Sequence, residues 1–166
     1  MSKPPATLHL IYGKIASGKS TLAAKLGQEP ATIVISEDAW LATLFAGEMT
    51  TLNDYVRCMA KLREVMAPHI VSLLQSGLSV VLDFQANTVD SRNWMRRVFE
   101  QANAPHILHV LDVPDAVCLK RLETRNAQGD HPFTISAEQF HHISRHVVPP
   151  SPAEKFNTRV VDKTTV

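Results

Sequence analysis

Short apolar runs alternate along the chain with longer amphipathic segments. The runs are rich in β-branched and aliphatic residues, a composition typical of strands. They predict five strands, over residues 8–12, 32–36, 78–83, 107–111 and 158–161. Between these strands, apolar positions recur every three or four residues, which is the spacing of a helix that buries one face.

The longest amphipathic segment follows Asn53, which is expected to cap a helix at its N-terminus. Pro68 is expected to kink this helix, and Gly77 suits its C-terminal cap. Residues 125–136 are polar, contain a glycine and a proline, and are expected to form a mobile loop. The apolar face of the long helix is made of Tyr55, Met59, Leu62, Met66, Ile70 and Leu73. Further helices are expected after residues 13–20, 32–36 and 78–83, after Pro114, and over about 137–145.

Strands that alternate with helices favour a parallel sheet that is covered by helices on both faces. We therefore expect an α/β fold, a three-layer αβα sandwich with a five-stranded parallel sheet. Residues 1–166 are expected to form a single domain in which residues 126–135 form a small lid. Ligands of such sheets bind at the carboxyl ends of the strands, so the residues that follow the strands are the candidates for chemistry.

Composition narrows the range of functions. Hydrophobic residues make up 45% of the chain and charged residues 20%, as in ordinary soluble proteins. The formal net charge is +1, which argues against a protein whose main task is to bind extended nucleic acid. Cys58 and Cys118 fall in predicted helices and are expected to be buried thiols. No apolar signal region and no membrane-spanning run is found, so a cytoplasmic protein is expected. The sequence indicates no oligomeric state.

The segment after the first predicted strand carries the most specific motif. It fits the P-loop pattern G-x-x-x-x-G-K-[ST], which cradles nucleotide phosphates. Its glycines let the backbone approach a polyphosphate, and successive N–H groups face the anion at the positive end of the next helix. Lys19 is expected to reach the β- and γ-phosphates, and Ser20 to ligate Mg²⁺. The predicted nucleotide-binding residues of this segment are Gly13, Lys14, Ile15, Ala16, Ser17, Gly18, Lys19, Ser20 and Thr21.

Two carboxylates follow the second and third predicted strands. Asp38 is expected to bind the substrate and to accept a proton from an attacking hydroxyl, with Glu37 as the weaker candidate. Alternatively, Ser36 caps a helix and the two acids stabilise its N-terminus. Asp83 ends an apolar run, as a Walker B acid does, and is expected to hold Mg²⁺ and contact the substrate; the alternative is an acid in a turn. Trp40 is close enough to Asp38 to line a substrate cleft, although packing is the commoner role of such a residue.

Four arginines fall on two predicted helices. Arg92 and Arg96 share a face near the carboxyl end of the sheet, and Arg92 is expected to bind an anionic or polar substrate. The alternative is a solvated helix surface. Arg121 and Arg125 also share a face, next to the polar loop, where they suit neutralising charge on a transferring phosphoryl group. Here the alternative is a surface helix whose arginines pair with acids such as Glu123.

In this order and spacing, the set resembles the small P-loop kinases of the AAA_33 type, which are related to polynucleotide 5′-hydroxyl kinase, zeta toxin and chloramphenicol phosphotransferase. The resemblance covers residues 8–161 and implies a P-loop NTPase fold. It implies that Asp38 is the general base, that Arg121 contacts the adenine side of the nucleotide and that Arg125 contacts its phosphates. It also implies that residues 126–135 form the lid and that residues 149–152 lie near the base.

These observations predict an ATP- and Mg²⁺-dependent kinase that transfers the γ-phosphoryl group to a hydroxyl of a small molecule or nucleotide-like acceptor. The predicted catalytic residues are Lys19, Asp38, Arg121 and Arg125. Two alternatives stay open: a nucleotide-binding switch without such an acceptor, and a nucleic-acid 5′-hydroxyl kinase. The chain contains neither N-K-x-D nor L-S-G-G-Q, so GTPase-type guanine recognition and an ABC transporter subunit are not supported.

Overall fold

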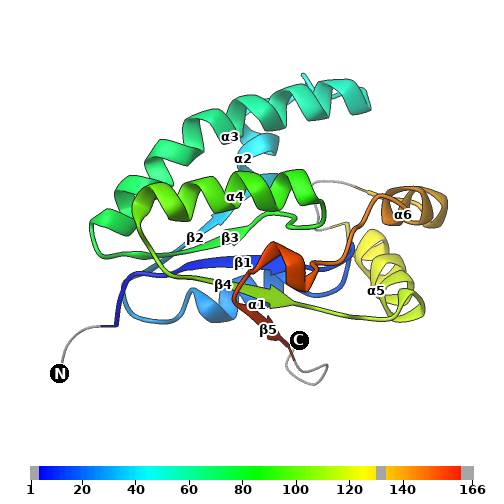
Figure 1. The fold of residues 1–166 in the computed structure, drawn as a ribbon. Helices are drawn as coiled ribbons and strands as arrows, with labels where there is room; N and C mark the ends of the chain where they lie inside the picture. Colours follow the sequence, from blue (N-terminus) through cyan, green and yellow to red (C-terminus); the bar gives the residue numbers. More distant parts are fainter. Residues whose placement is uncertain (1–3, 130–133, 162–166) are drawn as a thin grey trace.

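A five-stranded sheet forms the middle layer of the molecule (Figure 1). The computed structural model describes residues 4–129 and 134–161. The strand order is β2-β3-β1-β4-β5, and every neighbouring pair is parallel. The predicted α/β fold with a five-stranded parallel sheet is therefore confirmed. The strands are β1 (Leu8–Tyr12), β2 (Thr32–Ser36), β3 (Ser79–Asp83), β4 (His106–Val110) and β5 (Thr158–Val160).

Helices cover both faces of the sheet. In Figure 1, α3 and α4 lie above the sheet and α1 lies below it, while α5 and α6 stand together at the end toward which β1 runs. The helices are α1 (Lys19–Leu26), α2 (Glu37–Leu44), α3 (Leu52–Gln75), α4 (Val89–Ala102), α5 (Asp115–Gln128) and α6 (Ala137–Ser144), with a short 3₁₀ turn, η1 (Pro152–Glu154). None of the helices in the described ranges is long and apolar enough to cross a membrane.

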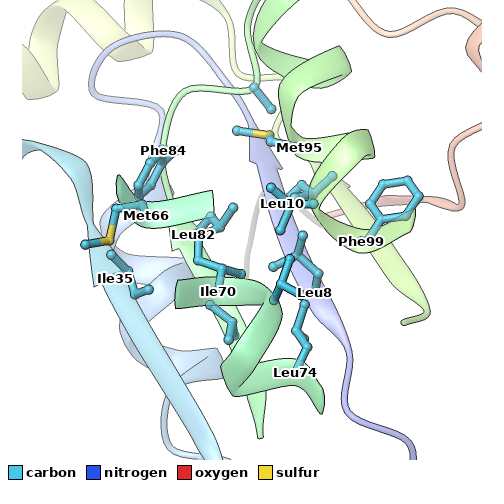
Figure 2. Close-up of a cluster of buried hydrophobic side chains, with 14 of the residues drawn as sticks. Leu8, Leu10, Ile35, Met66, Ile70, Leu74, Leu82, Phe84, Met95 and Phe99 are labelled. Carbon is cyan, nitrogen blue, oxygen red and sulfur yellow. The ribbon is translucent and has the colours of Figure 1, made fainter. Parts of the chain in front are cut away.

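The larger core lies between the sheet and the α3–α4 layer (Figure 2). In the close-up, Leu8 and Leu10 of β1 and Leu82 of β3 lie close to Ile70 of α3 and Met95 of α4. A smaller cluster beneath the sheet packs α1 against β1 and β3. Residues of β1 pack into the clusters on both faces of the sheet, so the position of the loop that follows β1 is well defined. The buried, free thiols of Cys58 and Cys118 agree with the prediction.

Two helix boundaries differ from the prediction. The N-cap of α3 is Thr51 rather than Asn53, because Thr51 and Asp54 form a reciprocal capping box. Helix α5 continues to Gln128 and ends at Gly129, whose φ is +69°. Arg125 consequently lies in the last helical turn, where its position is fixed by the helix, rather than in a loop.

Candidate functional site

The P-loop joins β1 to α1 in a strained, compact conformation. Ala16 and Gly18 have positive φ angles of 59° and 104°. A Cβ on Gly13 would lie 2.4 Å from the hydroxyl oxygen of Ser17, which is fully buried. The glycine at position 13 is therefore needed for packing within the loop itself, in addition to the predicted approach of a ligand.

Lys19 is folded back onto the loop. Its Nζ donates to the carbonyl oxygens of Gly13 and Lys14, at 2.7 Å in both cases. Burial lowers the pKa of Lys19 to about 8, although the nearby carboxylates of Asp83 and Asp38 act in the opposite direction. A phosphate group beside Lys19 would supply the negative charge that favours its protonated form.

Nucleotide binding is therefore expected to take up a proton at alkaline pH. In the free protein Lys19 loses its proton as the pH rises through about 8, and the phosphates of ADP would restore it. Calorimetry in two buffers with different ionisation enthalpies should show uptake approaching about one proton per molecule at about pH 9 and little at about pH 7. ADP affinity should fall as the pH rises above 8. Lys19→Arg, which stays protonated, should abolish the uptake; equal uptake in both proteins would contradict the role of Lys19.

The predicted magnesium ligands are brought together. Ser20 lies in the first turn of α1, and Asp83 is the last residue of β3. The Ser20 hydroxyl donates to Oδ2 of Asp83 at 2.8 Å. A hydroxyl and a carboxylate beside a P-loop are oxygen donors of the kind that Mg²⁺ prefers, so these residues fit the ion.

Helix α2 begins directly at the end of β2, which explains the position of the two acids. Ser36 pairs with Asp83 in the parallel register of β2 and β3, so the acids that follow Ser36 lie at the same edge of the sheet as Asp83. Ser36 also caps α2, because its hydroxyl accepts from Ala39 N at 3.4 Å. Both interpretations of this segment therefore hold. Ser36 caps α2, and Glu37 and Asp38 in its first turn line the pocket described below.

Glu37 is buried and belongs to a network that sequence reasoning missed. Only 2% of Glu37 is exposed, and its Oε1 accepts from Nε of Arg63 at 2.8 Å. Burial raises the pKa of Glu37, while the ion pair with Arg63 acts in the opposite direction. The guanidinium of Arg63 also lies over the rings of Phe84 and Trp94, at 5.9 and 5.3 Å from their centroids. This network holds Glu37, the residue before Asp38, in place.

Helix α5 brings two arginines to the P-loop. Arg121 donates through NH1 to the carbonyl oxygen of Ser17 at 3.2 Å. Nε and NH2 of Arg125 are buried and have no hydrogen-bond partner within the described part of the chain. Burial lowers the pKa of Arg125, and the charge of Asp38 acts against this shift. Buried guanidinium donors without partners are suited to an anion, because leaving them unmatched is unfavourable.

These groups surround one pocket of about 720 Å³. The P-loop with the first turn of α1, the end of β3 and the loop after it, and helices α2, α3, α5 and α6 all contribute to it. Residues 130–133 of the expected lid lie outside the described residues, whereas Thr134 and Ile135 line the pocket. The lining residues are Ile15, Ala16, Gly18, Lys19, Ser20, Thr21, Glu37, Asp38, Leu52, Tyr55, Asp83, Gln85, Arg121, Arg125, Thr134, Ile135 and Ile143.

Two predicted substrate residues lie elsewhere. Trp40 is on α2, 40% exposed, and does not line the pocket. Arg92 is completely buried and pairs with Glu154 of η1, with Nε 2.7 Å from Oε1. Its NH1 donates to the carbonyl oxygens of Ala86 and Val148. Arg92 therefore joins α4 to the C-terminal segment, and this structural role replaces the predicted substrate contact.

Arg92→Met is expected to lower the free energy of unfolding by about 3 kcal/mol, because it removes a buried ion pair and two hydrogen bonds to carbonyl groups. Urea denaturation measures this loss. Arg97→Met, at an exposed position of the same helix, should change stability by less than about 0.5 kcal/mol. A stable Arg92→Met protein with impaired acceptor binding would restore the original prediction.

Asn87 is a further residue that was not among the predicted site residues. It is 4% exposed and binds both backbone groups of Gly13. Its Oδ1 accepts from Gly13 N at 3.0 Å, and its Nδ2 donates to Gly13 O at 2.8 Å. The loop after β3 thereby holds the first residue of the P-loop in place.

Residues 8–150 match the model of the AAA_33 family, which is described as an AAA domain. The chain belongs to the AAA_33 family. No protein of curated function matches the sequence.

Solved structures with the same fold include named kinases. A presumed kinase from Chloroflexus aurantiacus is 25% identical, with 99% of this chain and 88% of that chain covered and a TM-score of 0.73. The APS kinase CysC of Mycobacterium tuberculosis, in complex with AMPPNP and APS, is 20% identical, with 96% and 91% covered and a TM-score of 0.62. Kti12 of Chaetomium thermophilum, in complex with ADP-AlF3, is 13% identical, with 95% and 92% covered and a TM-score of 0.71. This AAA_33 domain thus has the fold of P-loop kinases, as the resemblance predicted.

Proposed function

We propose that this AAA_33 domain is a kinase that uses ATP and Mg²⁺ to phosphorylate a hydroxyl of a small molecule or nucleotide-like acceptor. One observation carries the proposal: a single pocket is lined by the P-loop residues Lys19 and Ser20, by the carboxylates of Asp38 and Asp83, and by Arg125. A carboxylate such as Asp38 beside the phosphate site supports this proposal, because a kinase needs a group that can accept the proton of the acceptor hydroxyl.

The P-loop and α5 would hold the polyphosphate. Backbone N–H groups of the P-loop other than that of Ser17, which donates to Lys14 O, would bind its oxygens at the N-terminus of α1. Lys19 would turn from its carbonyl partners to the γ-phosphate. Nε and NH2 of Arg125, which have no hydrogen-bond partner among the described residues, would bind the same phosphate and stabilise its charge during transfer. Ser20 and Asp83 would hold Mg²⁺, which when bound neutralises polyphosphate charge.

Asp38 would orient the acceptor and take its proton. The acceptor oxygen would form a bond to the γ-phosphorus, the bond between that phosphorus and the bridging oxygen of ADP would break, and the hydroxyl proton would pass to the Asp38 carboxylate. Glu37, held by Arg63, is less suited to this role because its oxygens already accept hydrogen bonds from the guanidinium.

A mass-spectrometric screen tests the proposal. The protein would be incubated with ATP, Mg²⁺ and panels of nucleosides, oligonucleotides, sugars, antibiotics and cell extract. We expect one acceptor to gain a phosphate group in amounts equal to the ADP formed. ADP without a phosphorylated acceptor, or tight nucleotide binding without turnover, would instead favour a nucleotide-binding switch. Transfer to oligonucleotides with a steep loss of activity in salt would favour a nucleic-acid kinase.

A further inference from the structure

The charges that surround the pocket restrict the acceptor. We propose that the acceptor is a hydroxyl compound without negative charge, such as a polyol, an amino alcohol or an amino sugar, rather than a phosphorylated or sulfated molecule. This inference rests on the proposed kinase function and goes beyond it, because phosphoryl transfer from ATP is compatible with acceptors of any charge.

The cations that line the pocket lie on the nucleotide side. They are Lys19 of the P-loop and Arg121 and Arg125 of α5. Lys19 and Arg121 contact P-loop carbonyl groups, and the buried donors of Arg125 are suited to a phosphate. Lys14, the remaining cation of the loop, pairs with Asp115 at the start of α5 at 2.5 Å. The phosphates of bound ATP would therefore neutralise the cationic side chains among the described lining residues.

The opposite wall carries acids, an amide and apolar groups. It is formed by α2, by the first turns of α3 and by the loop after β3, and its lining residues are Glu37, Asp38, Leu52, Tyr55 and Gln85. None of these five side chains is a cation. Burial raises the pKa of Tyr55, the carboxylates of Glu37 and Asp38 raise it further, and Arg63 acts in the opposite direction.

Three arginines of α3 and α4 already pair with acids. Arg63 gives Nε and NH2 to the two oxygens of Glu37 and NH1 to Ser91. Arg57, at the exposed surface of α3, pairs with Asp54 at 3.1 Å. Arg92 of α4 pairs with Glu154 of η1. An anionic acceptor would therefore approach both a polyphosphate and Asp38 without a matching charge from the described residues, and such like-charge contacts are strongly unfavourable.

A charge-fractionated cell extract tests the inference without knowledge of the acceptor. Small molecules would be separated by anion exchange into a retained, anionic fraction and a flow-through of neutral and cationic molecules. Each fraction would be incubated with the protein, Mg²⁺ and ATP labelled in the γ-phosphate, with Lys19→Ala as the inactive control. We expect label to enter the flow-through, with the initial rate exceeding that of the anionic fraction by about tenfold or more.

The possible outcomes separate the two proposals. Label that enters the anionic fraction faster would overturn the inference on acceptor charge and leave the kinase function intact. Absence of label in both fractions, in protein that binds ATP, would contradict the kinase function and with it this inference.

A charge introduced at the pocket rim adds a second test. Leu52 lines the pocket and is 71% exposed, so Leu52→Arg should fold normally. It is expected to raise kcat/KM for a phosphorylated analogue of the acceptor about fivefold relative to kcat/KM for the uncharged acceptor. Val56→Arg, one turn further along α3 at a position that does not line the pocket, is the matched control. Equal effects of the two variants would contradict a charge-selective wall.

Discussion

Lys19→Ala is expected to lower kcat/KM for ATP by about 10³-fold. The ammonium group would contact the γ-phosphate in the ground state and stabilise the charge that develops during transfer, so its loss affects both binding and turnover. Removal of Nζ also leaves two P-loop carbonyl groups with one hydrogen bond fewer each.

Steady-state kinetics and nucleotide titration would measure the effect of Lys19→Ala. Lys25→Ala, at an exposed position of the last turn of the same helix, is the control and should behave like the original protein. Unchanged kinetics in Lys19→Ala would mean that the phosphates are bound elsewhere, and the proposed function would then have to be abandoned.

Asp38→Asn is expected to reduce kcat for phosphoryl transfer by about 10²- to 10⁴-fold while ATP affinity changes little. The amide keeps the size of the carboxylate but cannot accept the proton of the acceptor hydroxyl. Because Asp38 lies in the first turn of α2, the substitution also removes a favourable charge–dipole interaction, worth about 0.5 kcal/mol. This loss is too small to unfold the protein.

Single-turnover measurements with saturating ATP would isolate the transfer step in Asp38→Asn. Glu48→Gln, an exposed change shortly after α2, serves as the control for loss of one negative charge. If Asp38→Asn transferred phosphate at the original rate, proton removal would have to be assigned to another group, and Asp83 would be the first to test.

The strands and the P-loop could be predicted because their signals are local. Strands β1 and β3 are mostly buried apolar runs, and predicted strand ends agree with the structure to within one residue. The P-loop motif spans eight consecutive positions. Ser20 is its last residue and Asp83 is the last residue of β3, so the two could be placed close together before their hydrogen bond was seen. In a parallel sheet, residues that follow neighbouring strands meet at one edge, so Asp38 could also be placed.

The remaining parts of the site depend on contacts between distant residues. Arg92 is separated by 62 residues from Glu154, and no local pattern distinguishes an arginine that pairs across the fold from one that binds a substrate. Arg63 has the spacing of a partly buried helical position, but its partners come from α2, from the loop after β3 and from α4. The contact between Asn87 and Gly13 could not be predicted for the same reason, because the two residues are 74 positions apart and no local pattern links them.

The two carbonyl groups that hold Lys19 each have a second donor. Gly13 O also accepts from the side chain of Asn87, and Lys14 O also accepts from Ser17 N at 3.1 Å. When the ammonium group moves to an incoming phosphate, each carbonyl oxygen still accepts one hydrogen bond. The departure of Lys19 therefore carries little enthalpic penalty, and most of its attraction to the phosphate remains available for holding the nucleotide.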